Sequence, residues 1–453
     1  MPNENIVETR TAGTKVTEYT VYPTGDATVD PQGQTEDRMN IKFAVDNIAD
    51  GGTVVLKRHR LGDAPNSVTA FNFGGDNPNM RIFITKSVTI RGDDNPTREW
   101  TAPQGWSAGV AENGGTTISG GRSLLVAGQN PATAALTPVR VSIADIRFKN
   151  FYRSAIRIFA TRDQNEISGC SFVDYQVGQA GSPQGAFPFV VDSSGASLTI
   201  SPDMLAGNLK ISHNFIGPPP AVPDPTGINN LVHVSNCNLN LDFSNNRIED
   251  MYWVGIAVYG NEGKTTISNN YITKSSSFKE GTAIAVGVRP SFKPEFPPEG
   301  NEIKIRGNKV EVKSGNSAGI TVFLLKGDYF QPPAATPDAV HVFENTVEML
   351  VPDGPEAENR AALACLGACS NSLWRDNIVK GSARYGIWVS DHVPSFTRFP
   401  DGEPADLHPT DNHFQNNDLT EFTASNSQVS IAPAAVNTIM NNNSLGDVLP
   451  HVA

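Results

Sequence analysis

The chain has 453 residues, with 47 acidic and 35 basic side chains that give a formal net charge of −12, and 38% of its residues are hydrophobic. This length accommodates one large or two ordinary domains, and the composition excludes a disordered, collagenous or disulfide-scaffold protein. The acidic balance argues against general affinity for nucleic acid or for an anionic membrane, because both require basic side chains that offset phosphate charge.

The first residues and the cysteines bear on the cellular compartment. No run approaches the roughly 18 continuous apolar residues of a membrane span, and residues 1–5 lack the charged and apolar segments of a signal peptide. We therefore expect a cytoplasmic protein, or a secreted one whose signal has been removed. The four cysteines leave the redox compartment open, and we expect reduced core thiols. No histidines accompany the nearest pair, Cys365 and Cys369, so a zinc site is not expected.

The N-terminal part of the chain predicts one helix followed by strands. Residues 1–26 are expected to form an N-terminal extension. Residues 35–47 predict a short amphipathic helix, residues 51–56 a strand, and residues 82–92 the strands after it.

From residue 146 onward the sequence repeats a short frame, in which a small polar residue, often Asn, precedes a spacer and an apolar residue. Forty asparagines are present, and many occupy this frame. Ten frames between residues 146 and 443 span 297 residues, a mean interval of 33, which is typical of solenoid proteins. The frame positions are Ile146, Cys170, Asn214, Asn246, Asn270, Asn308, Asn345, Asn377, Asn417 and Asn443.

Each repeat also contains a run of the type Gly/Ala-Ile-x-Val. The clearest runs begin at Ala155, Gly255, Ala283, Gly319 and Gly386. The first apolar residue of the run precedes the next frame position by 14 residues in five repeats and by 24, 25 or 30 in three others. This spacing indicates a constant coil that carries insertions at one corner.

The apolar period of two predicts short strands, and the short turns between them favour a coil of parallel strands. The recurrence of Asn at one position predicts a stack of side chains at a sharp bend. Such asparagines can accept left-handed backbone geometry and hydrogen-bond along the stack.

With these repeats the chain resembles the right-handed parallel β-helix proteins of the pectin-lyase-like superfamily. The resemblance implies an all-β, single-domain right-handed solenoid over residues 27–446, with residues 447–453 as a C-terminal tail. It also implies that the helix at residues 35–47 caps the N-terminal end and protects exposed strand edges. The fold leaves function open, because many chemistries and some purely structural proteins share it.

In carbohydrate-active members of that superfamily the substrate lies along one strand face, and the Gly-Ile-x-Val strand is the candidate here. Three insertions rich in Pro and aromatic residues leave its C-terminal corner, at residues 289–301, 326–338 and 391–412. Long loops along one edge predict the wall of a groove.

Alternation along the strand predicts which side chains form the floor of that groove. The first outward position holds Arg157, His233, Ala257, Ala285, Thr321, Ala364, Trp388 and Ser430. The second holds Phe159, Ser235, Tyr259, Gly287, Phe323, Leu366, Ser390 and Ala432. We expect an open floor of small residues on which aromatic side chains stack against sugar rings. The coil near residues 189–192 has an alternative register near Ile200.

The candidate catalytic residues cluster along this face. Superfamily members that cleave acidic polysaccharides by elimination use Arg, Lys or a Tyr/His combination as the base. His233 and Tyr259 fall on adjacent coils and are expected to converge. The other catalytic candidates begin the loops: Arg289, Lys326, Asp328 and Asp391. The substrate-binding candidates are Arg157, Trp253, Phe323, Trp388 and His392.

Hydrolysis requires two carboxylates, and neither outward position holds one. A hydrolytic pair has to come from loop residues such as Asp328 and Asp391. No cofactor is required by the sequence. The Asp93–Asp94 and Asp411–Asn412 clusters offer oxygen ligands for calcium, although no calcium motif with fixed spacing is present. Arg306 is expected to be exposed scaffold.

We therefore predict a carbohydrate-active enzyme, lyase-like rather than hydrolytic, that acts on a polysaccharide or a small-molecule substrate. Neither a nucleic acid nor a membrane is an expected partner, and the chain is expected to be a monomer or a homotrimer. Two alternatives remain. One is a non-catalytic saccharide-binding or phage-fibre-like rod. The other is an intracellular isomerase, dehydratase or glycosyl-transferring enzyme.

Overall fold

The computed structural model describes residues 4–75, 80–94, 115–122, 124–152, 154–175, 187–192, 205–217, 232–251, 254–261, 263–274, 281–287, 302–313, 317–323, 340–350, 360–367, 369, 371–392 and 408–445. These residues form one helix and a succession of short strands, in two units. Unit 1 comprises residues 1–229 and 244–247, and unit 2 comprises residues 230–243 and 248–453. The expectation of a single domain over residues 27–446 stays a prediction.

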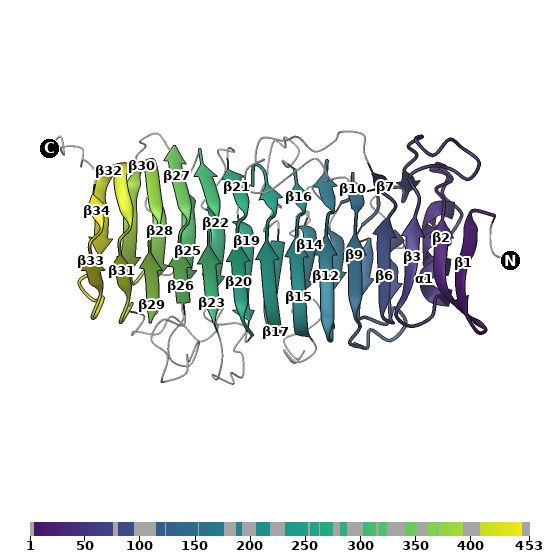
Figure 1. Cartoon of the computed structure of the whole chain (residues 1–453), viewed down its shortest axis with the longest axis horizontal. Coiled ribbons are helices and arrows are strands. Elements are labelled where there is room, and N and C mark those ends of the chain that lie inside the picture. The colour runs from purple at the N-terminus through teal and green to yellow at the C-terminus, as the bar shows by residue number, and fades with distance from the viewer. Residues whose placement is uncertain are drawn as a thin grey trace. The chain divides into compact units, whose positions relative to one another are not determined.

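Successive coils of unit 1 build three parallel sheets, and Figure 1 shows these coils in order from purple to teal. The first sheet contains β2 (Lys15–Val21), β3 (Gly52–Leu56), β6 (Val88–Gly92), β9 (Val141–Ala144), β12 (Gln164–Ser168) and β15 (Ala206–Ser212). The second contains β4 (Phe71–Asn72), β7 (Thr116–Ser119), β10 (Ile146–Lys149), β13 (Ser171–Val173) and β16 (Phe215–Ile216). The third contains β5 (Ile82–Ile84), β8 (Leu125–Ala127), β11 (Ser154–Ile158) and β14 (Phe187–Asp192).

Unit 2 repeats the three sheets. The first contains β20 (Thr265–Ser268), β23 (Ile303–Arg306), β26 (Val340–Phe343), β29 (Ser372–Arg375), β31 (His413–Gln415) and β33 (Ile439–Asn441). The second contains β21 (Tyr271–Lys274), β24 (Lys309–Val312), β27 (Thr346–Leu350) and β34 (Ser444–Leu445). The third contains β19 (Val254–Asn261), β22 (Gly281–Gly287), β25 (Ser317–Phe323) and β28 (Ala361–Leu366).

Three long strands contribute to two sheets each. β17 (Val232–Ser244) runs from the third sheet into the first, and β30 (Ile378–Ser390) and β32 (Asp418–Ile431) run from the second into the third. β18 (Arg247–Ile248) contains the boundary between the units. The predicted coil of parallel strands is confirmed, and the three long insertions fall where predicted, between the third sheet and the first.

The N-terminal end of unit 1 is closed by a hairpin and the predicted helix. β1 (Ile6–Ala12) pairs antiparallel with β2, and β2 joins β3 in the first sheet. Most of the predicted N-terminal extension therefore lies in strands of the fold, from Ile6 to Val21, and its boundary at residue 26 stays a prediction. The helix α1 (Glu36–Asn47) begins after Thr35, whose side chain accepts a hydrogen bond from the Arg38 N–H. The buried Asp37 carboxylate accepts hydrogen bonds from the backbone of Thr24 and Asn72, at 2.6 and 2.8 Å, and ties the helix to the first coils.

The predicted asparagine stack is present at the turn between the first and second sheets. In unit 2, the side-chain amide of each ladder asparagine donates to the side-chain oxygen of the next one at 2.8–2.9 Å. The ladder runs from Asn270 through Asn308, Asn345, Asn377 and Asn417 to Asn443. In unit 1, Asn214 donates to Asn246 at 3.0 Å. These bonds satisfy buried polar groups at the bends that the asparagines occupy.

The left-handed geometry belongs to the residue before each ladder asparagine, so its assignment to the asparagines themselves was wrong. These preceding residues have φ between 52° and 60°: His213, Asn245, Asn269, Gly307, Glu344, Asp376, Asn416 and Asn442. The residue before the asparagine makes the bend, and the asparagine side chain is left free to hydrogen-bond along the stack.

Glycine in the Gly-Ile-x-Val run is explained by close backbone approach. A Cβ built on Gly319 would lie 2.6 Å from the Ala362 carbonyl oxygen, and one on Gly255 would lie 2.7 Å from that of Ala283. Because backbone atoms of the next coil cannot move aside, the run tolerates only a small residue there.

Candidate functional site

The predicted order of the outward side chains is confirmed by the strand register of unit 2. His233 pairs with Ala257, and the row continues through Ala285, Thr321, Ala364, Trp388 and Ser430. The second row likewise runs from Ser235 through Tyr259, Gly287, Phe323 and Leu366 to Ser390. In unit 1, β14 occupies the coil that had two possible registers, and Val190 pairs with Arg157.

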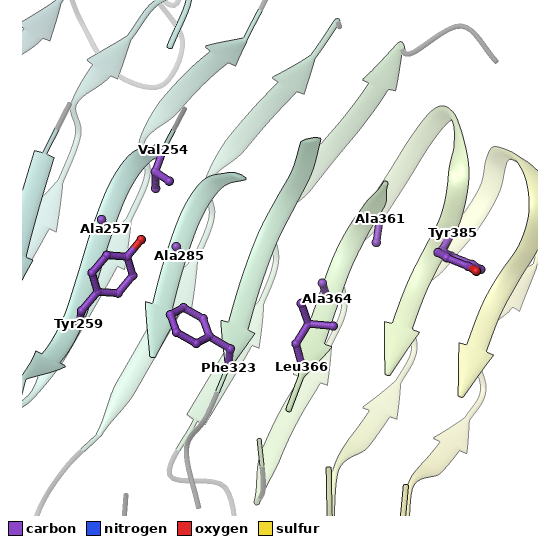
Figure 2. Close-up of a cluster of buried hydrophobic side chains, with 9 residues drawn as sticks. All are labelled: Val254, Ala257, Tyr259, Ala285, Phe323, Ala361, Ala364, Leu366 and Tyr385. Carbon is purple, nitrogen blue, oxygen red and sulfur yellow. The ribbon is translucent and has the colours of Figure 1, made fainter. Parts of the chain in front are cut away.

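The expectation of an open floor is wrong for most of this face. Ala257, Ala285 and Ala364 are buried, and Tyr259 and Phe323 are 1% and 0% exposed. Figure 2 shows them in one apolar cluster with Val254, Ala361, Leu366 and Tyr385. A parallel strand that is buried on both faces has an almost continuous apolar sequence, and Gly255–Tyr259 has that character.

His233 and Tyr259 converge as predicted. Their ring centroids lie 5.6 Å apart at an interplanar angle of 62°, and a second edge-to-face contact joins Tyr259 to Phe323 at 5.7 Å. His233 is 8% exposed. The pair is therefore a packed aromatic contact beneath the surface.

Among the described residues of this outer face in unit 2, the accessible aromatic side chain is Trp388 on β30. Trp388 is half-buried and packs against the apolar cluster. Its ring stacks with Tyr385 and with His392, both at 5.4 Å between centroids. The Arg384 guanidinium lies 5.2 Å from the Tyr385 ring centroid, and Asn426 donates to the Tyr385 hydroxyl at 3.1 Å.

Polar side chains complete the rim beside these rings. Asp391 is exposed and accepts a hydrogen bond from the Ser390 hydroxyl at 3.3 Å, while the backbone of His392 donates to the same hydroxyl at 3.1 Å. We call the group Arg384, Tyr385, Trp388, Asp391, His392 and Asn426 the Trp388 platform. The structure brings the predicted Trp388, Asp391 and His392 together here. The sequence did not predict Arg384, Tyr385 or Asn426 as site residues, although Tyr385 and Trp388 lie on either side of Gly386 and are a visible signal.

The remaining predicted site residues lie away from the Trp388 platform or outside the part of the chain that the structure describes. Arg157 is in unit 1, where its guanidinium covers the Phe159 ring at 4.7 Å. Four of the predicted residues fall outside the described residues, and their roles stay predictions: Trp253, Arg289, Lys326 and Asp328.

The residues considered for metal binding have other partners. Asp93 and Asp94 form ion pairs with Lys57 and Arg58, at 3.6 and 2.5 Å. Asn412 is buried and accepts a hydrogen bond from the Ser372 hydroxyl. No group of three His, Cys, Asp or Glu side chains is placed to hold a metal ion within the described ranges, and calcium stays a prediction.

All four cysteines are buried free thiols, as expected. Burial raises the pKa of the Cys170 thiol to about 12. No helix in the described part of the chain is long and apolar enough to cross a membrane.

Comparison with models of protein families agrees with this architecture. A family model described as a right-handed beta helix region matches residues 115–303. The protein is a right-handed parallel β-helix repeat protein. The crystal structure of PfbA, a surface adhesin of Streptococcus pneumoniae, aligns with a TM-score of 0.43 and 12% identity, over 94% of this chain and 91% of that chain. No curated protein matches the chain significantly.

Proposed function

We propose that this protein binds a saccharide at the Trp388 platform. The observation that carries the proposal is that Trp388 remains accessible, whereas the other aromatic side chains described on this outer face of unit 2, Tyr259, Phe323 and Tyr385, are buried. The C–H patches of sugar rings pack on such a ring, and flanking polar groups orient the hydroxyls by hydrogen bonds. Arg384 supplies hydrogen-bond donors, Asp391 supplies acceptors, and the Asn426 amide supplies both.

The buried state of the His233–Tyr259 pair favours binding without catalysis. Lyase activity is nevertheless the second candidate, because a Tyr/His combination on adjacent strands suits β-elimination and the two rings lie 5.6 Å apart. A general base has to reach the proton that it removes, however, and both side chains are almost inaccessible. Hydrolysis by Asp328 and Asp391 is the third reading, which rests on sequence alone.

The binding test uses calorimetry with neutral and acidic oligosaccharides, with and without calcium. We expect Trp388→Ala to weaken binding by roughly 30-fold, or about 2 kcal/mol, because the principal ring contact is lost. Tyr271→Ala is the matched control, since Tyr271 is also a half-buried aromatic but lies on the outer face of the second sheet. Unchanged affinity of a folded Trp388→Ala protein would rule out the platform.

The same panel separates the catalytic candidates when ultraviolet absorbance and reducing ends are followed in parallel. Elimination raises both signals, and hydrolysis raises reducing ends alone. If elimination occurs, Tyr259→Phe and His233→Ala are expected to abolish turnover and leave binding at Trp388 intact. Both residues would take part in proton abstraction, and neither belongs to the Trp388 platform. Turnover that persists in both variants contradicts the lyase assignment. If neither absorbance nor reducing ends increase, the protein binds saccharide without cleaving it.

A further inference from the structure

The last described coil of unit 2, drawn in yellow in Figure 1, ends the three sheets. The first sheet ends at β33 and the second at β34, while the third ends at the last residues of β32. Within the described chain, β33 pairs with β31 alone and β34 with β32 alone, so each presents one edge that no strand covers. An uncovered edge is a template on which another chain can pair.

Side chains that point into the interior are accessible at this end, although their counterparts in the preceding coil are buried. Leu445 pairs with Leu419 in the second sheet, and Leu419 is fully buried whereas Leu445 is 55% exposed. In the third sheet Val389 is fully buried, and its partner Ile431 is 39% exposed. Met440, at the inward position of the first sheet, is half-buried. The hydrophobic interior is therefore open at the last described coil.

The exposed apolar side chains of the described chain are concentrated in the same coil. Eleven large apolar side chains are exposed among the described residues, and four of them fall within residues 431–445. These four are Ile431, Val436, Ile439 and Leu445. We call them, together with Met440, the open end. Apolar side chains gathered in this way are typical of a surface that another molecule covers.

The open end lies in an uncharged stretch of the sequence. Residues 422–446 contain no Asp, Glu, Lys, Arg or His, although 18% of the chain is Asp, Glu, Lys or Arg. Strand edges that avoid pairing with other chains usually carry such charges. Two copies of a chain with a net charge of −12 repel one another, and this repulsion is weakest where the contacting surfaces are uncharged. A partner of opposite charge gains no attraction there, so the composition favours a second copy of this chain.

The N-terminal end of unit 1 is built differently. The helix α1 packs on the first strands and covers the interior with Ile41, Ala44 and Val45, which are at most 1% exposed. The outermost strand, β1, carries the exposed Glu8 and Arg10. A covered and charged end offers no apolar surface to the open end, so like ends meet and the assembly closes at two copies.

We infer that the open end is the interface of a homodimer, in which the last coils of two copies meet about a two-fold axis. The axis lies perpendicular to the stack of strands, and it sets the strands of one copy antiparallel to those of the other. Ile431 and Leu445 are then covered by the same surface of the second copy, as Val389 and Leu419 are covered by the coil that follows them. This arrangement departs from the monomer or homotrimer expected from the sequence.

The test is the mass of the protein in solution, measured by sedimentation velocity from about 1 to about 100 μM. We expect a monomer at low concentration and a dimer at high concentration, with no larger species. Because the interface is uncharged, raising the salt from about 20 mM to about 500 mM is expected to change the dissociation constant less than about threefold. No saccharide is present, so the result does not depend on the Trp388 platform.

The variant Ile439→Lys/Leu445→Lys places like charges on both sides of the contact. We expect it to raise the dissociation constant of the dimer by about 100-fold or more. Leu350→Lys/Ile378→Lys is the matched control, because both side chains are exposed apolar residues of the second sheet outside the last coil. The control is expected to change the dissociation constant less than about twofold. Mixing the lysine variant with Ile439→Glu/Leu445→Glu is expected to restore a dimer that neither variant forms alone.

Each outcome decides the proposal. A monomer at every concentration of the native protein overturns it, whatever covers the open end instead. A mass that continues to grow beyond the dimer also overturns it, because ends that close about a two-fold axis cannot add a third copy. Equal dimerisation of Ile439→Lys/Leu445→Lys and the native protein places the interface elsewhere and has the same consequence. Melting temperatures establish that the variants are folded, and the dimer restored in the mixture excludes misfolding as the cause of dissociation.

Discussion

Replacing Asn345 with alanine is expected to lower the free energy of unfolding by about 4 kcal/mol, because one buried side chain serves four hydrogen bonds. Its amide donates to the Ile305 carbonyl and to Asn377, both at 2.9 Å. Its oxygen accepts from the Asn308 amide at 2.9 Å and from the Asn308 backbone at 3.0 Å. Alanine removes all four bonds at a fully buried position, where bulk solvent does not readily replace them.

The matched control is Asn443→Ala, at the end of the same ladder. Asn443 is half-buried, so water can replace its bonds to Asn417 and to the Phe414 carbonyl. We expect a loss of about 1 kcal/mol there. Urea unfolding followed by circular dichroism measures both variants. Equal losses at the two positions would show that burial of the ladder does not determine its strength.

Replacing Lys274 with methionine is expected to remove a pH dependence of stability. Lys274 is fully buried on β21, and burial lowers its pKa from 10.5 to about 7. Between these two pKa values the unfolded chain binds a proton that the folded chain does not. The free energy of unfolding of the native protein therefore rises from about pH 7 to about pH 10, by on the order of 4 kcal/mol. Below about pH 7 the full cost of burying the charge remains.

We expect Lys274→Met to be more stable than the native protein at neutral pH, with the difference shrinking as the pH rises. Urea unfolding at several pH values measures the difference, and other titrating groups cancel in the comparison. Lys264→Met is the matched control, because Lys264 is exposed on the preceding strand connection and is expected to leave the pH profile unchanged. A constant difference between Lys274→Met and the native protein would contradict the assignment.

The repeat, the strand order and the register were determined by the sequence alone. A shift of one residue turns every side chain of a strand to the opposite face, so the Gly-Ile-x-Val runs allowed one alignment of His233, Ala257 and Trp388. The asparagine frame likewise predicted the ladder, because a buried amide at every bend needs a partner on the next coil.

Burial of the outer face and assembly of the platform were decided by tertiary structure. Alternation shows which way Tyr259 and Phe323 point, but not whether further chain covers them, and their burial removed the predicted open floor. Tyr385 and Asn426 are 41 residues apart and meet because consecutive coils stack. Contacts between coils depend on which positions are stacked and which are left accessible, and no local pattern in one coil contains that information.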